Sequence, residues 1–327
     1  MAAVRRGRRQ PCVLVGSRLA IQRAAELVGV PWSRFEPHTG QELREGRLYF
    51  LDPGPELRAA DLSPQRPTRA AGRSQLAAID TAFDLVRAQP GSALVTGPVS
   101  KALIARCGAP GAERFAGHTE WLQARDGAKS AIMCFASPRL TTSLASTHLP
   151  LHRVPEWLTP EHVAEASFQL ARFLIELGHE APRVAVCSLN PHAGESELLG
   201  DEERRAIVPG MRLARRRLRG KAELVGPIGA ESAYRLAYAG KYAGVVAMYH
   251  DQATIPTKLV AFGTAVNVTL GLSRVRTSVD HGTAYDIAWQ GKADARGMVA
   301  ALKLAERLVL LSKARGVAGE RARQRQG

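Results

Sequence analysis

Residues 159–189, TPEHVAEASFQLARFLIELGHEAPRVAVCSL, place a helix directly before a strand and so decide the fold class. The helix is predicted to begin with Thr159 as a hydroxyl N-cap and Pro160 at its first position. Apolar residues then recur at helical spacing as far as Gly178, which suits the position after a helix end. The apolar run at 184–189 is typical of a buried strand. This stretch therefore predicts one unit of a layered α/β protein.

The alternation of predicted helices and strands continues in both directions along the chain. Further strands are predicted at 12–15, 93–95, 131–136, 141–146, 245–248 and 266–270, and further helices at 19–27, 75–87, 209–219 and 297–311. Residues 36–74, rich in Pro, Gly and Arg, are predicted to be irregular. No G-x-G-x-x-G sequence occurs, so the usual dinucleotide-binding fingerprint is absent. The pattern predicts an α/β fold with a largely parallel sheet.

Composition limits the class of protein. The chain has 327 residues, 45% of them hydrophobic and 23% charged, the balance of a globular protein of one large or two smaller domains. No apolar run approaches the roughly 18 residues of a membrane span. The four cysteines are far apart and form no C-x-x-C pair, which disfavours a disulfide scaffold or a zinc ribbon and favours a reducing, cytoplasmic setting.

The formal net charge of +15 raises the question of nucleic-acid binding. Eight of these charges lie at the two ends, in residues 1–10 and 312–327. Arginine also outnumbers lysine throughout, and no aromatic residues are interleaved to stack on bases. Nucleic-acid binding as the main function is therefore disfavoured.

Three histidines share one context, because each follows a predicted strand. His148, His192 and His250 stand where a strand opens into a loop, which is where α/β proteins place their sites. Neutral imidazoles from three loops suit a divalent metal with open coordination positions. The spacing matches no local ligand motif, so three separately hydrogen-bonded histidines remain the alternative.

Other polar residues suggest anion binding. The sequence Gly117-His118-Thr119-Glu120 fits either close approach to an anion or a capping turn. Lys258, Asn267 and Arg276 together offer the donors that suit a phosphate or carboxylate. Two polar runs that contain glycine also suggest close approach to a ligand: residues 277–284 and, as a weaker signal, residues 96–101.

These motifs, in this order, resemble the 4-hydroxythreonine-4-phosphate dehydrogenase family of vitamin B6 biosynthesis. The resemblance covers residues 75–311 and rests on six sequences: VTGPVSK at 95–101, GHTE at 117–120, THLPL at 147–151, LNPHAGE at 189–195, MYHDQ at 248–252, and GL through RTSVDHGTA at 271–284. The stretch 281–294 also resembles the adenine-side segment of isocitrate and isopropylmalate dehydrogenases, which bind NAD without a glycine-rich fingerprint. The implied fold is the two-domain fold of that superfamily, with residues 1–108 and 253–327 on the cofactor side and 109–252 forming the substrate, metal and dimerisation domain.

The resemblance implies a site for each part of the reaction. The metal ligands would be His148, His192 and His250, with His250 supplied by the partner subunit of a homodimer and Zn, Mg or Co as the metal. The substrate would be bound by His118, Thr119, Lys258, Asn267, Arg276 and Glu231, and NAD or NADP by His281, Gly282, Thr283, Ala284 and Asp294. Lys258 and Asp251 are the expected catalytic residues, Lys258 anchoring the substrate and Asp251 orienting His250 or relaying a proton.

The implied reaction is oxidation, with decarboxylation, of 4-phosphohydroxy-L-threonine to 3-amino-2-oxopropyl phosphate in pyridoxal 5'-phosphate biosynthesis. A metal would hold the substrate alkoxide while hydride leaves for the nicotinamide. Alternatives are a sister dehydrogenase acting on 4-phospho-threonate, 4-phospho-erythronate or a carboxylated cis-dihydrodiol, and an inactive relative that binds ligands or associates with nucleic acid.

Two departures from the family keep these alternatives open. The family opens with a strand and a Gly-Asp-Pro-x-Gly-Ile-Gly-Pro-Glu loop, whereas this sequence begins at what resembles the family's second strand, residues 12–16. Either the start was assigned too late or the loop is lost. Glu231 also stands where a substrate-side Asp is expected, which keeps the charge and lengthens its reach.

Overall fold

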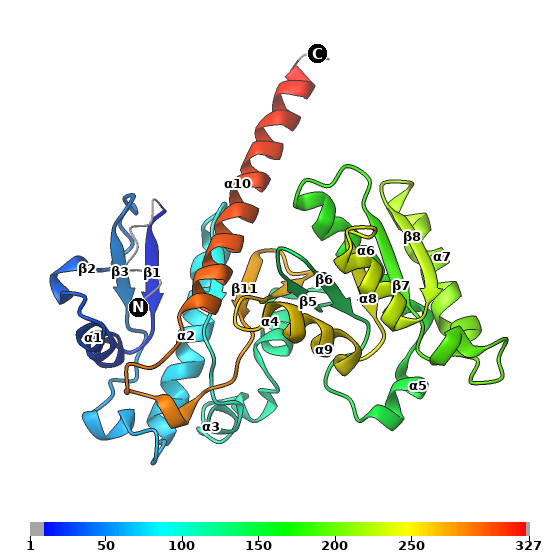
Figure 1. Cartoon of the computed structure of the whole chain (residues 1–327). Coiled ribbons are helices and arrows are strands. Elements are labelled where there is room, and N and C mark those ends of the chain that lie inside the picture. Colours follow the sequence, from blue (N-terminus) through cyan, green and yellow to red (C-terminus); the bar gives the residue numbers. More distant parts are fainter. Residues whose placement is uncertain (1–9, 325–327) are drawn as a thin grey trace.

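The computed structural model describes residues 10–324 and has the expected α/β architecture (Figure 1). Its strands are β1 (Cys12–Val15), β2 (Phe35–Pro37), β3 (Leu48–Leu51), β4 (Ala93–Thr96), β5 (Ile132–Ala136), β6 (Thr141–Leu144), β7 (Arg183–Cys187), β8 (Glu223–Ile228), β9 (Gly244–Ala247), β10 (Val266–Leu270) and β11 (Val275–Val279). Its α-helices are α1 (Arg18–Leu27), α2 (Arg69–Ala88), α3 (Lys101–Ala105), α4 (His118–Asp126), α5 (Val154–Trp157), α6 (Pro160–Glu176), α7 (Val208–Leu218), α8 (Ala230–Tyr238), α9 (His250–Ala261) and α10 (Arg296–Gln324).

The strands form two sheets. The smaller has the order β1-β3-β2, and the larger has the order β4-β11-β10-β5-β6-β9-β7-β8. Antiparallel pairing is confined to β11-β10, β10-β5 and β5-β6, so the sheets of the described chain are largely parallel, as predicted. The basic N-terminal residues Arg5, Arg6, Arg8 and Arg9 lie outside the described residues, as does the C-terminal end from 325 onward.

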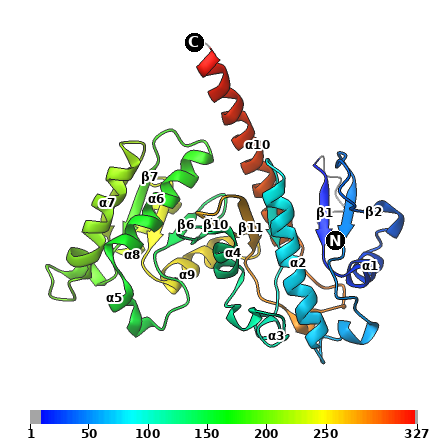
Figure 2. The ribbon, with the colours of Figure 1, turned by 180° about the vertical axis from the view of Figure 1, so that it is seen from behind.

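Helices cover both faces of the larger sheet. On one face α6, α7 and α10 contribute the largest core cluster, in which Leu170, Met211 and Leu308 are buried. On the other face α2 packs on β4, α9 on β5 and β6, and α8 on β7 and β9. Figure 1 shows α10 in front at the centre of the molecule, and Figure 2, from behind, shows α2 in front there. The larger sheet is therefore the middle layer of three.

The helix and strand that decided the fold class form as predicted. The Thr159 hydroxyl accepts a hydrogen bond from the amide of His162, which caps α6. Gly178 follows the helix with φ +103°, a conformation that glycine adopts without strain. Strand β7 then carries four fully buried residues. Local capping and burial thus agree with the global fold at this point.

The prediction for residues 36–74 was partly wrong. This stretch contains β3 and the first turns of α2. Strand β3 is only four residues long, and the surrounding Gly, Pro and Arg residues obscured its apolar run. Strands β8 and β11 were also missed, since β8 contains Gly226-Pro227 and β11 is largely polar. In each case tertiary pairing overrides a weak local pattern.

Candidate active site

The three predicted metal-binding histidines follow adjacent parallel strands. Strand β9 pairs in parallel with β6 on one side and with β7 on the other. His148 follows β6, His250 opens α9 directly after β9, and His192 follows β7. Since the carboxyl ends of parallel strands meet at one edge of a sheet, all three loops leave from the same edge.

The structure brings two of these histidines together within one chain, whereas the resemblance implied that His250 comes from the partner subunit. The ring centroids of His148 and His250 are 5.7 Å apart. His250 Nδ1 lies 2.7 Å from Asp251 Oδ1, so an ionised Asp251 accepts the Nδ1 proton and leaves Nε2 with a free lone pair. Burial, followed by the charge of Lys101, lowers the pKa of His148. The lowered pKa of His148 favours its neutral imidazole, the form that binds a metal.

His192 is exposed, in a loop of unusual backbone conformation. His192, Ala193, Glu195, Ser196 and Glu197 all have positive φ between 43° and 74°. Such conformations are costly for residues other than glycine and persist only where the surrounding structure holds them. Within residues 10–315, whose side chains are described, no three His, Cys, Asp or Glu side chains are close enough to hold a metal ion.

A buried carboxylate holds the base of the His192 loop. Glu203 Oε1 accepts hydrogen bonds from the amides of Leu189 and Asn190, both at 2.9 Å, and its Oε2 accepts one from the Asn190 side chain. A side chain at Gly200 would collide with that Asn190 amide, because a Cβ there would lie 2.5 Å from Nδ2. The loop is thus fixed at its ends, and sequence analysis missed Glu203.

Arg276 is the most deeply buried charge among the predicted substrate residues. It is 3% exposed on β11 and donates from Nη1 to Thr269 and from Nη2 to Thr96, at 2.8 and 2.7 Å. Its Nε is buried and has no hydrogen-bond partner. The same holds for Oδ1 of Asn267 on the neighbouring strand β10. Burial lowers the Arg276 pKa to about 10, with a partial offset from Glu120. The guanidinium therefore stays charged at neutral pH, and Nε is its one nitrogen without a hydrogen-bond partner.

His118 lies close enough to Arg276 for the guanidinium charge to lower the pKa of the imidazole. Burial, then the charges of Arg276 and Lys101, lowers the pKa of His118 to about 3. The imidazole is therefore neutral at physiological pH. His118 and Thr119 form the first turn of α4, whose N-cap Gly117 provides no side-chain cap. This leaves the first amides of α4 without a side-chain acceptor, as an anion-binding turn requires.

Gly117 is required by its neighbours. A Cβ at this position would lie 2.9 Å from Glu120 Oε2 and 3.3 Å from Lys101 Nζ. Lys101 and Glu120 therefore meet over the start of α4. Both residues stood in quoted motifs, but neither was selected as a site residue, because sequence spacing does not show that α3 and α4 converge.

Lys258 faces an acidic residue that was also missed. Its Nζ lies 4.0 Å from Asp280 Oδ1. Burial raises the pKa of Asp280, and the charges of Lys258, His250 and His281 oppose this rise. We use the term polar cluster for the charged and imidazole side chains that these effects connect. They are Lys101, His118, Glu120, His148, His250, Lys258, Arg276, Asp280 and His281.

The predicted cofactor segment follows β11. The Thr283 hydroxyl donates to the Val99 carbonyl at 3.3 Å, which joins this segment to the loop after β4. Ala284 has φ +52°, and His281 Nδ1 lies 3.0 Å from the Gly282 carbonyl. Asp294 is exposed and pairs with Arg296 at the start of α10. These residues line one side of the polar cluster through His281, but Asp294 is engaged by Arg296.

Glu231 stands apart from these residues. It is exposed in the first turn of α8, after β8, the outermost strand beyond β7. No contact between Glu231 and the polar cluster is found in the described part of the chain. The structure therefore groups His118, Thr119, Lys258 and Arg276 around one region, and leaves Glu231 exposed on α8 and His192 on an exposed loop.

Comparison with known proteins identifies the family. Residues 8–305 match the family model described as pyridoxal phosphate biosynthetic protein PdxA. A 4-hydroxythreonine-4-phosphate dehydrogenase of Desulfosudis oleivorans is 42% identical over 270 residues, which cover 82% of this chain and 77% of that protein.

Two solved structures share the fold. The crystal structure of 4-hydroxythreonine-4-phosphate dehydrogenase from Klebsiella pneumoniae has a TM-score of 0.73 and 32% identity, covering 91% of this chain and 88% of its own. A terephthalate 1,2-cis-dihydrodiol dehydrogenase from Burkholderia xenovorans has a TM-score of 0.63 and 26% identity, covering 94% and 91%. No helix in the described residues is long and apolar enough to cross a membrane. The chain belongs to the PdxA family, in which it is similar to proteins named 4-hydroxythreonine-4-phosphate dehydrogenase, and it is an oxidoreductase of that family.

Proposed function

We propose that this enzyme oxidises 4-phosphohydroxy-L-threonine with NAD or NADP, assisted by a divalent metal, and that the product 3-amino-2-oxopropyl phosphate feeds pyridoxal 5'-phosphate synthesis. The buried Arg276, with its unpartnered Nε, carries the proposal. A charged guanidinium with a free donor inside the protein is costly unless a ligand uses it. An anionic group of the substrate meets that need.

The remaining substrate contacts follow from charge and hydrogen-bonding capacity. Lys258 supplies a mobile point charge, and neutral His118 offers a hydrogen bond without competing for the anion. The free amides at the start of α4, with Thr119, suit a phosphate oxygen. Asn267 adds an unpartnered amide oxygen from β10, an acceptor that suits the ammonium or hydroxyl group of the substrate rather than its anionic groups. Together these groups fix the phosphate and carboxylate, so that the hydroxyl-bearing carbon is held in one place.

Of the expected metals, Zn and Co suit imidazole ligands, whereas Mg prefers oxygen ligands. The imidazoles of His148 and His250 lie with their ring centroids 5.7 Å apart, and Asp251 fixes the ring of His250. A divalent metal bound there supplies Lewis-acid stabilisation of an alkoxide. The protein's own contribution is to lower the pKa of His148 by burial and to orient the ring of His250 through Asp251. Lys258, beside Asp280, stands where it can hold the substrate and exchange a proton with it.

A third ligand is expected from His192, and the site is expected to be shared across a homodimer. Helix α9, which begins with His250, exposes Ile255, Leu259 and Phe262, with 67%, 84% and 78% of their surface accessible. Three large apolar side chains on one helix and its end are typical of a protein interface. Burying this face against a second copy would place His250 at the interface, beside the metal site.

The cofactor is assigned to the segment after β11. Residues His281, Gly282, Thr283 and Ala284 border the polar cluster, with Asp294 further along the same connection. We place the cofactor-side domain at 1–108 and 253–327 and the substrate and metal domain at 109–252. Of the cofactor residues, Asp294 would have to leave Arg296 before it could bind a ribose.

A second candidate substrate class is a carboxylated cis-dihydrodiol. The likeness to the terephthalate dihydrodiol dehydrogenase favours it, and so does Glu231 in place of a substrate-side Asp. Formation of NADH distinguishes the two. Purified enzyme with NAD and a divalent metal is offered either 4-phosphohydroxy-L-threonine or the dihydrodiol. Turnover of the threonine phosphate at the higher kcat/KM supports the proposal, and preference for the dihydrodiol refutes it.

A further inference from the structure

The backbone ladder between β7 and β9 stops just before the loops that carry two of the histidines. The last paired residues are Val186 in β7 and Val246 in β9. Ser188 and Met248 lie two residues beyond this pair, at the same level along the two strands, and both are buried. In the described part of the chain, no backbone hydrogen bond joins Ser188 to Met248. Their polar backbone groups therefore need other partners.

The side-chain amide of Gln252 lies between these two strand ends. Its Oε1 accepts a hydrogen bond from the Met248 amide at 2.7 Å, and its Nε2 donates to the Ser188 carbonyl at 2.9 Å. A carboxamide has an acceptor and a donor like those of a peptide group. The side chain of Gln252 thus takes the place of a peptide unit and continues the link between β7 and β9.

The other side of Met248 is held by the strand that leads to the third histidine. The Met248 carbonyl accepts hydrogen bonds from the Ser146 amide at 3.2 Å and from the Ser146 hydroxyl at 2.7 Å. Ser146 is fully buried and stands two residues before His148. Met248 therefore connects all three loops, through Ser146 on the β6 side and through Gln252 on the β7 side.

On the β7 side the connection continues to the base of the His192 loop. The Ser188 hydroxyl donates to the Asn190 carbonyl at 2.9 Å, and Glu203 accepts a hydrogen bond from the Asn190 amide. The run of positive φ begins two residues later, at His192. This histidine thus follows directly upon a backbone segment that Gln252 and Glu203 hold in place.

Capping of α9 does not account for the geometry of Gln252. It is the third residue of α9, and a glutamine at that position commonly accepts a hydrogen bond from the N-cap amide. The N-cap here is Tyr249, whereas Gln252 bonds the amide of the residue before it. Its second bond crosses to a residue 64 positions earlier in the chain, beyond the end of β7. That bond relates two loops and contributes nothing to a helix end.

We propose that Gln252 is a positioning residue of the metal site. Its amide sets the spacing between the His192 loop and the paired imidazoles of His148 and His250. This role rests on the proposed function, since it takes these imidazoles as metal ligands. The loops of every copy are held by the same anchors, so the role is the same whether one chain or two supply the ligands to one metal.

Equilibrium dialysis of the full chain with Co²⁺ tests this role. Gln252→Met has a side chain of similar length and removes both hydrogen bonds. We expect the Kd for Co²⁺ to rise by at least about tenfold, the lower end of the effect of groups that orient metal ligands. The visible absorption of bound Co²⁺, which reports the ligand geometry, is expected to change as well.

The outcomes separate this role from the proposed function. An unchanged Kd or an unchanged absorption spectrum in Gln252→Met, while the unsubstituted protein binds Co²⁺, would overturn the positioning role alone. Absence of Co²⁺ binding by the folded, unsubstituted protein would refute the metal site of the proposed function, and the positioning role with it.

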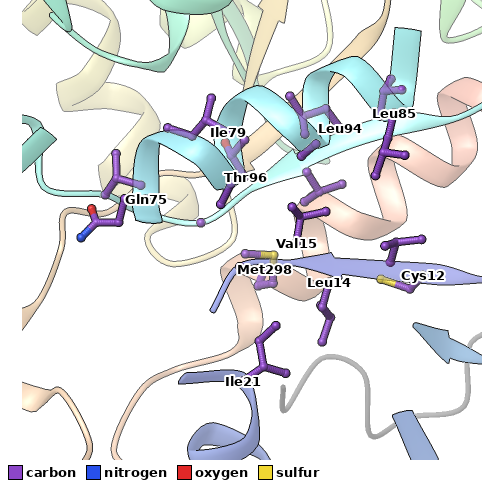
Figure 3. A pocket seen from close by; sticks show the side chains of 18 of the residues that line it. Cys12, Leu14, Val15, Ile21, Gln75, Ile79, Leu85, Leu94, Thr96 and Met298 are labelled. Atoms are coloured by element: carbon purple, nitrogen blue, oxygen red, sulfur yellow. The ribbon is translucent and has the colours of Figure 1, made fainter. Parts of the chain in front are cut away.

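Gln75→Met is the matched control. Gln75 is also half-buried, and its Oε1 accepts a hydrogen bond from the Ser100 amide at 3.0 Å. Figure 3 shows Gln75 on α2, among the residues that line the hollow beside β1 and β4. This bond ties α2 to the loop after β4 and involves none of the three histidine loops. With both variants folded by circular dichroism, an equal loss of Co²⁺ affinity in the two would overturn the proposal.

Gln252→Glu separates the two hydrogen bonds and needs no metal. At neutral pH the ionised carboxylate still accepts from the Met248 amide, but it cannot donate to the Ser188 carbonyl. Hydrogen–deuterium exchange with mass spectrometry is expected to show at least about tenfold faster exchange in residues 188–192 for this variant and for Gln252→Met. Exchange in residues 247–250 is expected to accelerate only in Gln252→Met. Unchanged exchange in residues 188–192 in Gln252→Glu would overturn the proposal.

Discussion

The guanidinium of Arg276 donates to the hydroxyl of Thr96 at 2.7 Å, joining side chains 180 residues apart in the sequence. Thr96 ends β4 and Arg276 lies in the adjacent β11, so the bond sits between paired strands. With Thr269 holding the second terminal nitrogen, the guanidinium plane is fixed while Nε stays free. This arrangement fixes the direction of the Nε–H group, which has no partner in the described part of the chain.

Replacing Arg276 by lysine tests that orientation. Lysine keeps the charge and has three donors, but it lacks the planar fork that bonds both threonines while holding a further N–H in a fixed direction. We expect Arg276→Lys to raise the KM for the phosphorylated substrate by at least about tenfold, with a smaller effect on kcat. Steady-state kinetics measures both values. Arg172→Lys, at an exposed pair with Glu176, is the control and should leave KM unchanged; an unchanged KM in Arg276→Lys would contradict the assignment.

The low pKa of His118 predicts a pH dependence of stability. Its folded-state pKa of about 3 lies below the ordinary value of 6.5, so between these values the unfolded chain binds a proton that the native chain excludes. The free energy of unfolding should therefore rise with pH across this window, by at most about 1.4 kcal/mol per pH unit from this group, and level off above it.

Urea unfolding at several pH values between 4.5 and 7.5 measures this slope. His118→Gln should flatten it, because glutamine does not titrate. His179→Gln, at an exposed position, serves as the control and should keep the slope of the unsubstituted protein. If His118→Gln and the unsubstituted protein show the same slope, His118 is not buried in the neutral form.

Asp251 is expected to act on metal binding through His250. Asp251→Asn removes the carboxylate that accepts the Nδ1 proton of His250, and partners of this kind are typically worth 10–100-fold in metal affinity. Equilibrium dialysis with Co²⁺ should show a weakening in that range. Glu161→Gln, an exposed change on α6, should have no effect. Equal Co²⁺ affinity in the two variants would show either that His250 is not a metal ligand or that Asp251 does not orient it.

The exposed face of α9 predicts the oligomeric state. We expect the protein to be a dimer that Leu259→Glu converts to a monomer, because a buried unpaired carboxylate is costly at an apolar interface. Size-exclusion chromatography with light scattering gives the mass. Leu27→Glu on α1, which is also exposed, should remain dimeric. A monomeric unsubstituted protein would refute both the interface and the shared site.

Much of the fold follows from local sequence pattern. Strand β10 and helix α6 were predicted almost to the residue, because apolar runs and a capping threonine act locally. The placement of His148, His192 and His250 at one sheet edge was also expected, since each follows a strand. Strand β11 could not be predicted from its pattern, as Arg276 and Thr277 break the apolar run and are buried only through their partners.

The site could be predicted less well from the sequence, because it depends on loops and helices that only tertiary packing brings together. Lys101, Glu120 and Asp280 come from three separate connections, and only tertiary packing brings their charges beside His118, His148 and Lys258. Such convergence leaves no local periodicity in the sequence.

The rate of NADH formation from 4-phosphohydroxy-L-threonine tests the central claim most directly. The account predicts turnover by the unsubstituted protein that requires an added divalent metal, and its loss in a folded His148→Ala variant. Turnover that is equal in the variant, or the absence of turnover with Zn, Co and Mg by a folded and dimeric protein, would contradict it.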